Sequence, residues 1–216
     1  SVGAASGAVF QWRVGAETEK GQRDVYLWVP AEIEAVRGVV MGGMTLMERE
    51  MARDERIRRA CAEEGLAIVF LMCGLGQVDV QKVLDKLAWT SGYEELSDAP
   101  LLFVGHSAGG PPAKALAIRM AHRCFGVVQY RGGVPGGSTS VPAGVPALMM
   151  IGQFDEFGGT MRNAEGRETW QGGRDAMAAF RAARPGNLGS VVVEPGAGHF
   201  AWSHRNAEYL SLFIRK

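Results

Sequence analysis

Short, uninterrupted apolar runs are the feature that most limits how this chain can fold. Leu66 to Met72, Leu101 to Val104 and Ala147 to Ile151 consist almost entirely of aliphatic and aromatic residues. Runs of this length are typical of strands buried on both faces, and they are far too short to cross a bilayer. Amphipathic segments separate them. The sequence therefore predicts the α/β class, with a mostly parallel central sheet and helices on both of its faces.

The remaining elements follow the same alternation. We expect an antiparallel edge hairpin from strands 9–14 and 24–29 with a turn at Gly21, and further strands at 38–41, 125–130 and 190–193. Helices are predicted over 48–64, 78–90, 111–123, 174–183 and 205–214, with Ser203 as the N-cap of the last. The charges of 48–64 are interpreted as a solvated helix face. At 216 residues, the chain is expected to form a single domain over 1–216.

The charge balance limits the class of partner. Lys plus Arg and Asp plus Glu both number 23, so no strong field favours nucleic acid or an anionic membrane surface. We expect a soluble protein without membrane insertion, whose partner is a small or locally recognised molecule. Cys61, Cys73 and Cys124 are interpreted as buried free thiols. Residues 1–8 are compatible with the start of an exported chain after removal of a leader, and neither the compartment nor the oligomeric state is predicted.

The segment around Ser107 carries the strongest chemical signal. The apolar run ending at Val104 enters Gly105-His106-Ser107-Ala108-Gly109, and a helical segment follows. In this strand–turn–helix context a Gly-x-Ser-x-Gly sequence forms a sharp turn that exposes the serine above the sheet edge. Glycines two residues to either side leave room for the turn. Ser107 is therefore predicted to be a nucleophile.

A serine hydroxyl needs a base, and the base needs an orienting acid. Among four histidines, His199 is favoured because it follows an apolar strand in a glycine-rich loop at the same sheet edge. Asp155 follows the strand between Ser107 and His199 and is the predicted acid, with the adjacent Glu156 as its rival. The separations of 48 and 44 residues each leave room for a strand, a helix and loops.

The remaining site residues are predicted from their places at strand ends. A developing oxyanion needs two backbone donors, for which we choose Ala108 after the nucleophile and Met44 in the loop after the third strand, with Thr45 as the alternative. Tyr130, Phe157 and Trp202 are candidates for a substrate pocket lined by aromatic side chains, in which Phe154 and Phe200 also take part.

Together, Gly-His-Ser-Ala-Gly, Gly-Gln-Phe-Asp and Gly-Ala-Gly-His-Phe resemble motifs of the α/β-hydrolase superfamily. The likeness is greatest to its small, lid-poor serine esterases, such as dienelactone-hydrolase-like, feruloyl or acetylxylan esterase-like and polyhydroxybutyrate depolymerase-like members. The chain departs from many of them in having Gly-Gly-Met-Thr where they have His-Gly. The stretch between the strands ending near Tyr130 and beginning near Ala147 is too short for a cap domain, so the resemblance implies an open site.

These observations predict a serine carboxylic-ester hydrolase that acts through an acyl-enzyme on a small-molecule or polymer-linked ester. The same three residues also suit an acyltransferase or a peptidase, and a binding domain of this fold without turnover is the remaining alternative. No metal or organic cofactor is expected. His199 and His204 lack the spacing of a zinc motif, and the segment 73–79 lacks the last glycine of a dinucleotide fingerprint.

Overall fold

The computed structural model describes residues 9–45, 47–157 and 169–216. Its strands are β1 (Trp12–Ala16), β2 (Arg23–Trp28), β3 (Gly38–Gly43), β4 (Leu66–Leu71), β5 (Leu101–His106), β6 (Cys124–Tyr130), β7 (Ala147–Gly152) and β8 (Gly189–Glu194). Its α-helices are α1 (Glu48–Arg53), α2 (Glu55–Glu63), α3 (Val80–Ser91), α4 (Gly110–Arg119), α5 (Thr169–Ala183) and α6 (His204–Ile214). Short 3₁₀ turns lie at η1 (Leu75–Gln77), η2 (Glu94–Ser97) and η3 (Ser107–Gly109).

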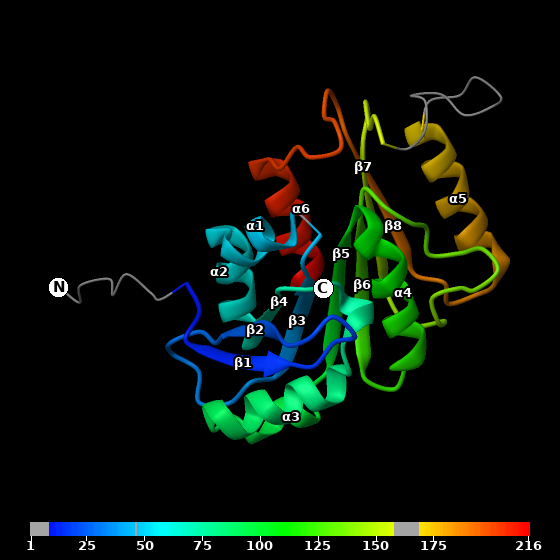
Figure 1. The fold of residues 1–216 in the computed structure, drawn as a ribbon. Coiled ribbons are helices and arrows are strands. Elements are labelled where there is room, and N and C mark those ends of the chain that lie inside the picture. The colour runs from blue at the N-terminus through cyan, green and yellow to red at the C-terminus, as the bar shows by residue number, and fades with distance from the viewer. Residues whose placement is uncertain (1–8, 46, 158–168) are drawn as a thin grey trace.

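The strands form one sheet in the order β1-β2-β4-β3-β5-β6-β7-β8. Strand β2 pairs antiparallel with both β1 and β4, whereas every pair from β4 to β8 is parallel. The predicted edge hairpin and parallel sheet are thus confirmed. In a parallel sheet all carboxyl ends meet at one edge, where ligands bind in open α/β sheets. We call this edge the carboxyl edge, and it lies towards the top of Figure 1.

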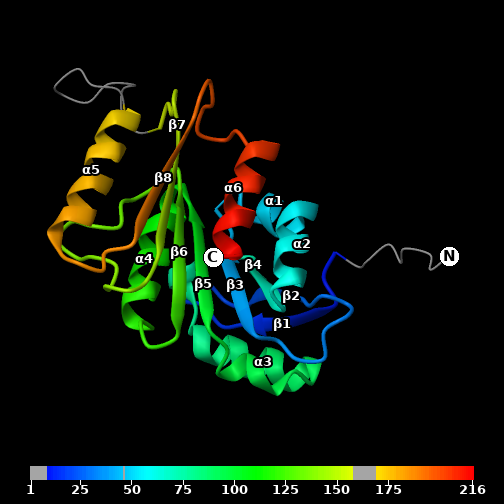
Figure 2. The ribbon, with the colours of Figure 1, turned by 180° about the vertical axis from the view of Figure 1, so that it is seen from behind.

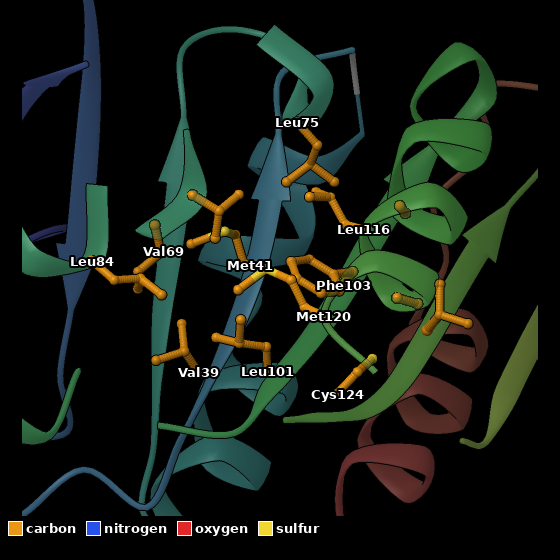
Figure 3. Close-up of a cluster of buried hydrophobic side chains, with 14 of the residues drawn as sticks. Val39, Met41, Val69, Leu75, Leu84, Leu101, Phe103, Leu116, Met120 and Cys124 are labelled. Atoms are coloured by element: carbon orange, nitrogen blue, oxygen red, sulfur yellow. The ribbon is translucent and has the colours of Figure 1, made fainter. Parts of the chain in front are cut away.

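Alternate side chains of each central strand belong to two separate cores. In β4, Val69 and Leu71 face the helices α3, α4 and α5, whereas Ile68 and Phe70 face α1, α2 and α6. Figures 1 and 2 show the two groups of helices on opposite sides of the sheet. Figure 3 shows the first core, where Met41 and Phe103 from neighbouring strands meet Leu116 of α4. Burial on both faces explains the uninterrupted apolar runs.

The predicted helix over 48–64 is in fact two helices. Asp54 has an extended backbone, with φ −64° and ψ 126°, and its side chain accepts a hydrogen bond from the amide of Arg56 at 2.9 Å. It therefore ends α1 and caps α2, an N-capping role for which aspartate is favoured. The first residue, Glu48, is buried at 2% exposure, so the interpretation of 48–64 as a solvated face is wrong at this position.

Several other features agree with the sequence-based expectations. Ser203 caps α6 by accepting from the amide of Asn206 at 3.2 Å. Cys61, Cys73 and Cys124 are all buried and free. The connection from Arg131 to Pro146 contains neither helix nor strand, so no helical cap is inserted between β6 and β7. No helix in the described ranges is both long and apolar enough to cross a membrane.

Candidate active site

Ser107 lies on a sharp turn between β5 and α4, and its backbone is left-handed with φ 53°. For a residue with a side chain this conformation is strained, and such strain gathers at functional sites. The two flanking glycines make the turn possible. A Cβ on Gly105 would lie 2.1 Å from the carbonyl oxygen of Gly109, and one on Gly109 would lie 2.8 Å from Oγ1 of Thr45. The turn predicted from the sequence is therefore present, with Ser107 partly exposed.

Asp155 and His199 meet at the carboxyl ends of β7 and β8. Nδ1 of His199 lies 2.7 Å from Oδ1 of Asp155, and both side chains are about 5% exposed. The carboxylate can only accept, so Nδ1 carries the proton and Nε2 of the neutral ring is left as the acceptor. This is the tautomer that a general base requires. The turn after β7 and the loop after β8 lie side by side in both ribbon views.

Glu156, the rival acid, has a different partner. Its Oε2 accepts a hydrogen bond from the backbone amide of His199 at 2.8 Å. Hydrogen bonds from its own backbone and from that of His199 lower the pKa of the Glu156 carboxyl. The two adjacent carboxylates thus hold different parts of the same residue: Asp155 holds the ring and Glu156 the main chain.

His106 connects the serine turn with the loop that carries His199. It is fully buried, and its Nε2 lies 3.1 Å from the carbonyl oxygen of His199, to which it donates. The two imidazole rings are 4.9 Å apart between centroids. The turn that carries Ser107 is therefore tied through His106 to the loop that carries His199, although no hydrogen bond joins the side chains of Ser107 and His199 in the described ranges. Such bonds are often long in a site without substrate.

Burial of His106 makes the stability of the fold depend on pH. Its Nδ1 has no hydrogen-bond partner among the described residues, so a second proton on the ring would be unpaired. Burial lowers the pKa of His106 from 6.5 to about 4. In the unfolded chain the ring takes up a proton near pH 6.5, but in the folded protein only near pH 4. The stabilising effect of the neutral ring is therefore present above pH 6.5 and is lost as the pH falls towards 4.

We expect the free energy of unfolding to fall by up to about 3 kcal/mol between pH 6.5 and pH 4 because of His106 alone. Urea unfolding at several pH values measures it. Because carboxylates also titrate in this window, the comparison is with His106→Gln, whose amide still donates to His199 but does not ionise. His122→Asn, which removes an exposed histidine, is the control. Equal pH slopes for wild type and His106→Gln would contradict the assignment.

The loop after β8, residues 195–203 (the base loop), is anchored at both ends by a buried polar network. Glu194 forms an ion pair with Arg131 at 2.6 Å, and its other oxygen accepts from the hydroxyl of Ser203. The Tyr130 hydroxyl donates to the carbonyl of Ala201 within the loop. Burial raises the pKa of Tyr130, which keeps this donor protonated. Sequence reasoning missed the pair of Arg131 and Glu194, because nothing local to either residue relates β6 to β8.

Two of the predicted aromatic contacts need correction. Tyr130 is completely buried and its hydroxyl supports the base loop, so it does not line a substrate pocket. Trp202 packs edge-on against Tyr130 and donates from Nε1 to Asp54 at 3.1 Å, so it joins the loop to the start of α2. Phe157, in contrast, is 64% exposed and its ring centroid is 4.8 Å from that of His199.

The backbone amides predicted as oxyanion donors differ in whether the fold already gives them a hydrogen-bond partner. Ala108 is exposed in the first turn after the nucleophile, where backbone amides have no partner within a helix. The amide of Met44 donates to the carbonyls of Leu71 and Cys73 at 2.8 and 2.9 Å. It is therefore occupied in the fold, and the choice of Met44 is wrong. The amide of the alternative, Thr45, donates to Oε2 of Glu48 at 3.1 Å.

Glu48 is a buried carboxylate behind the serine turn that sequence reasoning did not identify. Its Oε1 accepts from the amide of His106 at 2.7 Å while its Oε2 holds Thr45. It thereby fixes the loop after β3 against the turn that carries Ser107. A signal was available, because Thr-x-x-Glu at 45–48 has the spacing of a capping box, in which the glutamate bonds back to the amide three residues earlier.

Comparison with solved structures identifies the architecture. The chain superposes on an alpha-beta serine hydrolase homologue from Coxiella burnetii with a TM-score of 0.58 and 18% identity, covering 97% of this chain and 98% of that one. A serine hydrolase without a lid from Xanthomonas campestris matches at 0.53 and 17%, covering 97% and 94%. The carboxylesterase EstE1 from a metagenomic library matches at 0.61 and 16%, covering 94% and 87%. The chain has the α/β-hydrolase fold.

No protein-family model and no curated protein matches the sequence. At these identities the likeness concerns the fold alone, and any inference about the chemistry of this α/β-hydrolase fold rests on its own residues. Among the described residues, no group of three or more His, Cys, Asp or Glu side chains could hold a metal ion.

Proposed function

We propose that this protein is a serine carboxylic-ester hydrolase with Ser107, His199 and Asp155 as its catalytic residues. The observation that carries the proposal is the 2.7 Å contact of His199 with Asp155, in a loop that His106 links to the strained left-handed turn of Ser107. The chain order of serine, aspartate and histidine is the one used on this fold. The serine hydrolases and the carboxylesterase among the structural neighbours support the same reaction class.

In the proposed reaction, Oγ of Ser107 attacks the ester carbonyl while Nε2 of His199 takes the hydroxyl proton. Asp155 stabilises the imidazolium. The bond to the leaving oxygen then breaks, His199 passes the proton to that oxygen, and the alcohol departs. Water, activated by His199, attacks the acyl-enzyme and releases the acid and Ser107. The chain itself supplies the nucleophile, base and donors, so these steps need neither a metal nor an organic cofactor.

We assign the oxyanion donors to the amide of Ala108 and the side-chain hydroxyl of Thr45. The hydroxyl takes the place of the backbone amide that we expected from the loop after β3, because the amides of Met44 and Thr45 both donate hydrogen bonds within the protein. The Thr45 hydroxyl lies against Gly109, next to the start of α4 and two residues from the nucleophile. Hydroxyl groups serve as oxyanion donors when they are held in place, and Glu48 holds this loop.

The substrate class is proposed to be an accessible ester, either bulky or attached to a polymer. Residues 131–146 form no helical cap, and a site without such a cap suits esters that are too bulky for an enclosed pocket.

Labelling with a fluorophosphonate tests the proposal. This reagent phosphonylates a serine only when a base activates it, so we expect one adduct per chain on the peptide that contains Ser107, with loss of p-nitrophenyl acetate hydrolysis in proportion to labelling. Heat-denatured protein is the control and should remain unlabelled. A folded chain that is not labelled would support a binding domain without turnover and would overturn the proposed function.

A further inference from the structure

Two exposed aromatic rings lie directly on the imidazole of His199. Phe157 is 64% exposed and Phe200 is 44% exposed, although both are large apolar side chains. Their ring centroids lie 4.8 and 4.9 Å from that of His199, and 5.1 Å from each other. The two rings cover the buried imidazole, and their outer surfaces are exposed to solvent beside it.

The imidazole does not need both rings to be held in place. Asp155 fixes Nδ1, Glu156 holds the backbone amide, and His106 holds the carbonyl of the same residue. Exposed apolar surface is costly in water, and a contiguous patch of it next to polar catalytic groups marks a binding surface. A single exposed ring such as Trp89 on α3, at 92% exposure, needs no such explanation.

The proposed mechanism determines whether the alcohol half or the acyl half of an ester lies next to Phe157 and Phe200. His199 must deliver a proton to the departing oxygen, so that oxygen lies at the imidazole. The carbonyl oxygen lies instead at the donors of Ala108 and Thr45. Rings that contact the imidazole are consequently next to the alcohol half of the ester, on the far side of the scissile bond from the acyl chain.

We propose that Phe157 and Phe200 form an alcohol subsite that selects esters of aromatic, or similarly flat and apolar, alcohols. The inference rests on the proposed function and adds the part of the substrate that is recognised. Stacked or edge-to-face contacts with a substrate ring stabilise it beyond the effect of buried area. The selectivity therefore concerns the alcohol, while the acyl group is left open.

The test compares benzyl acetate with methyl acetate, because their alcohols have similar acidity and their acyl groups are identical. We expect wild type to show a kcat/KM for benzyl acetate that is about tenfold or more above that for methyl acetate. Phe157→Ala and Phe200→Ala should each reduce this ratio by about three- to tenfold. Trp89→Ala, the matched control, should leave it unchanged. A second pair, methyl phenylacetate and methyl acetate, varies the acyl group, and its ratio should not respond to either phenylalanine.

Each other outcome has a definite meaning. If both variants lose activity equally towards benzyl and methyl acetate, the rings only support His199 and the subsite is wrong. If the acyl pair responds instead of the alcohol pair, the assignment of sides is overturned. Fluorophosphonate labelling of Ser107 separates the levels: labelling without alcohol selectivity refutes the subsite alone, whereas absence of labelling refutes the proposed function as well.

Discussion

Replacing Ser107 by alanine is expected to lower kcat for p-nitrophenyl acetate by about five to six orders of magnitude. The reason is that the attack has no other nucleophile in the proposed mechanism. Hydrolysis will not fall to the rate in water, because Ala108 and Thr45 can still stabilise the oxyanion formed when water attacks directly. Stopped-time assays at high enzyme concentration, together with the thermal unfolding midpoint, measure the effect on the reaction and on folding.

The matched control for this change is Ser190→Ala, which removes an exposed hydroxyl from β8. It should leave kcat within about twofold of wild type. A folded Ser107→Ala protein that retains more than a few per cent of activity would show that another residue is the nucleophile, and the assignment of the turn would then be wrong.

Asp155→Asn is expected to lower kcat by about four orders of magnitude, whereas Glu156→Gln should cost less than tenfold. An asparagine amide can donate to Nδ1, which favours the tautomer with the proton on Nε2, and that ring is no longer a base. In Glu156→Gln the side-chain carbonyl still accepts from the amide of His199, so the 2.8 Å contact survives. Steady-state kinetics of both variants on one ester measure the contrast.

Asp155 and Glu156 are adjacent in the chain. Each substitution replaces a carboxylate by the amide of the same size and removes one negative charge. The pair therefore controls for the general loss of charge at this turn. A larger loss of kcat in Glu156→Gln than in Asp155→Asn would mean that Glu156, and not Asp155, is the acid that orients His199.

The positions of the proposed catalytic side chains were predictable because they depend on strand ends. Ser107, Asp155 and His199 each follow an apolar run, and parallel strands bring their carboxyl ends to one edge. Chain order and strand ends were enough to place the three residues at one edge, without any distance between their side chains. The buried strands were equally clear, because alternation is lost where both faces of a strand are covered.

The predictions that failed concern the direction of single groups. Met44 lies in the right loop, but its amide turns back towards β4. Tyr130 lies at the right strand end, but its side chain points into the core. Asp54 interrupts a charge pattern that continues on both sides of it, so periodicity alone does not reveal the break. Strand order and spacing place a residue at an edge of the sheet. The local backbone conformation decides which groups its amide and its side chain contact, and spacing does not reveal that conformation.

Among the described strands, β8, which leads directly into the base loop, lies at one end of the sheet and pairs with β7 alone. Most of its side chains are only partly buried. Edge elements with few buried contacts detach by local opening at a smaller free energy than global unfolding requires. Detachment of β8 would carry His199 away while the strands from β1 to β7 remain paired. On the proposed mechanism, local opening of β8 would therefore end activity before the whole sheet unfolds, and the ion pair of Glu194 with Arg131 opposes that opening.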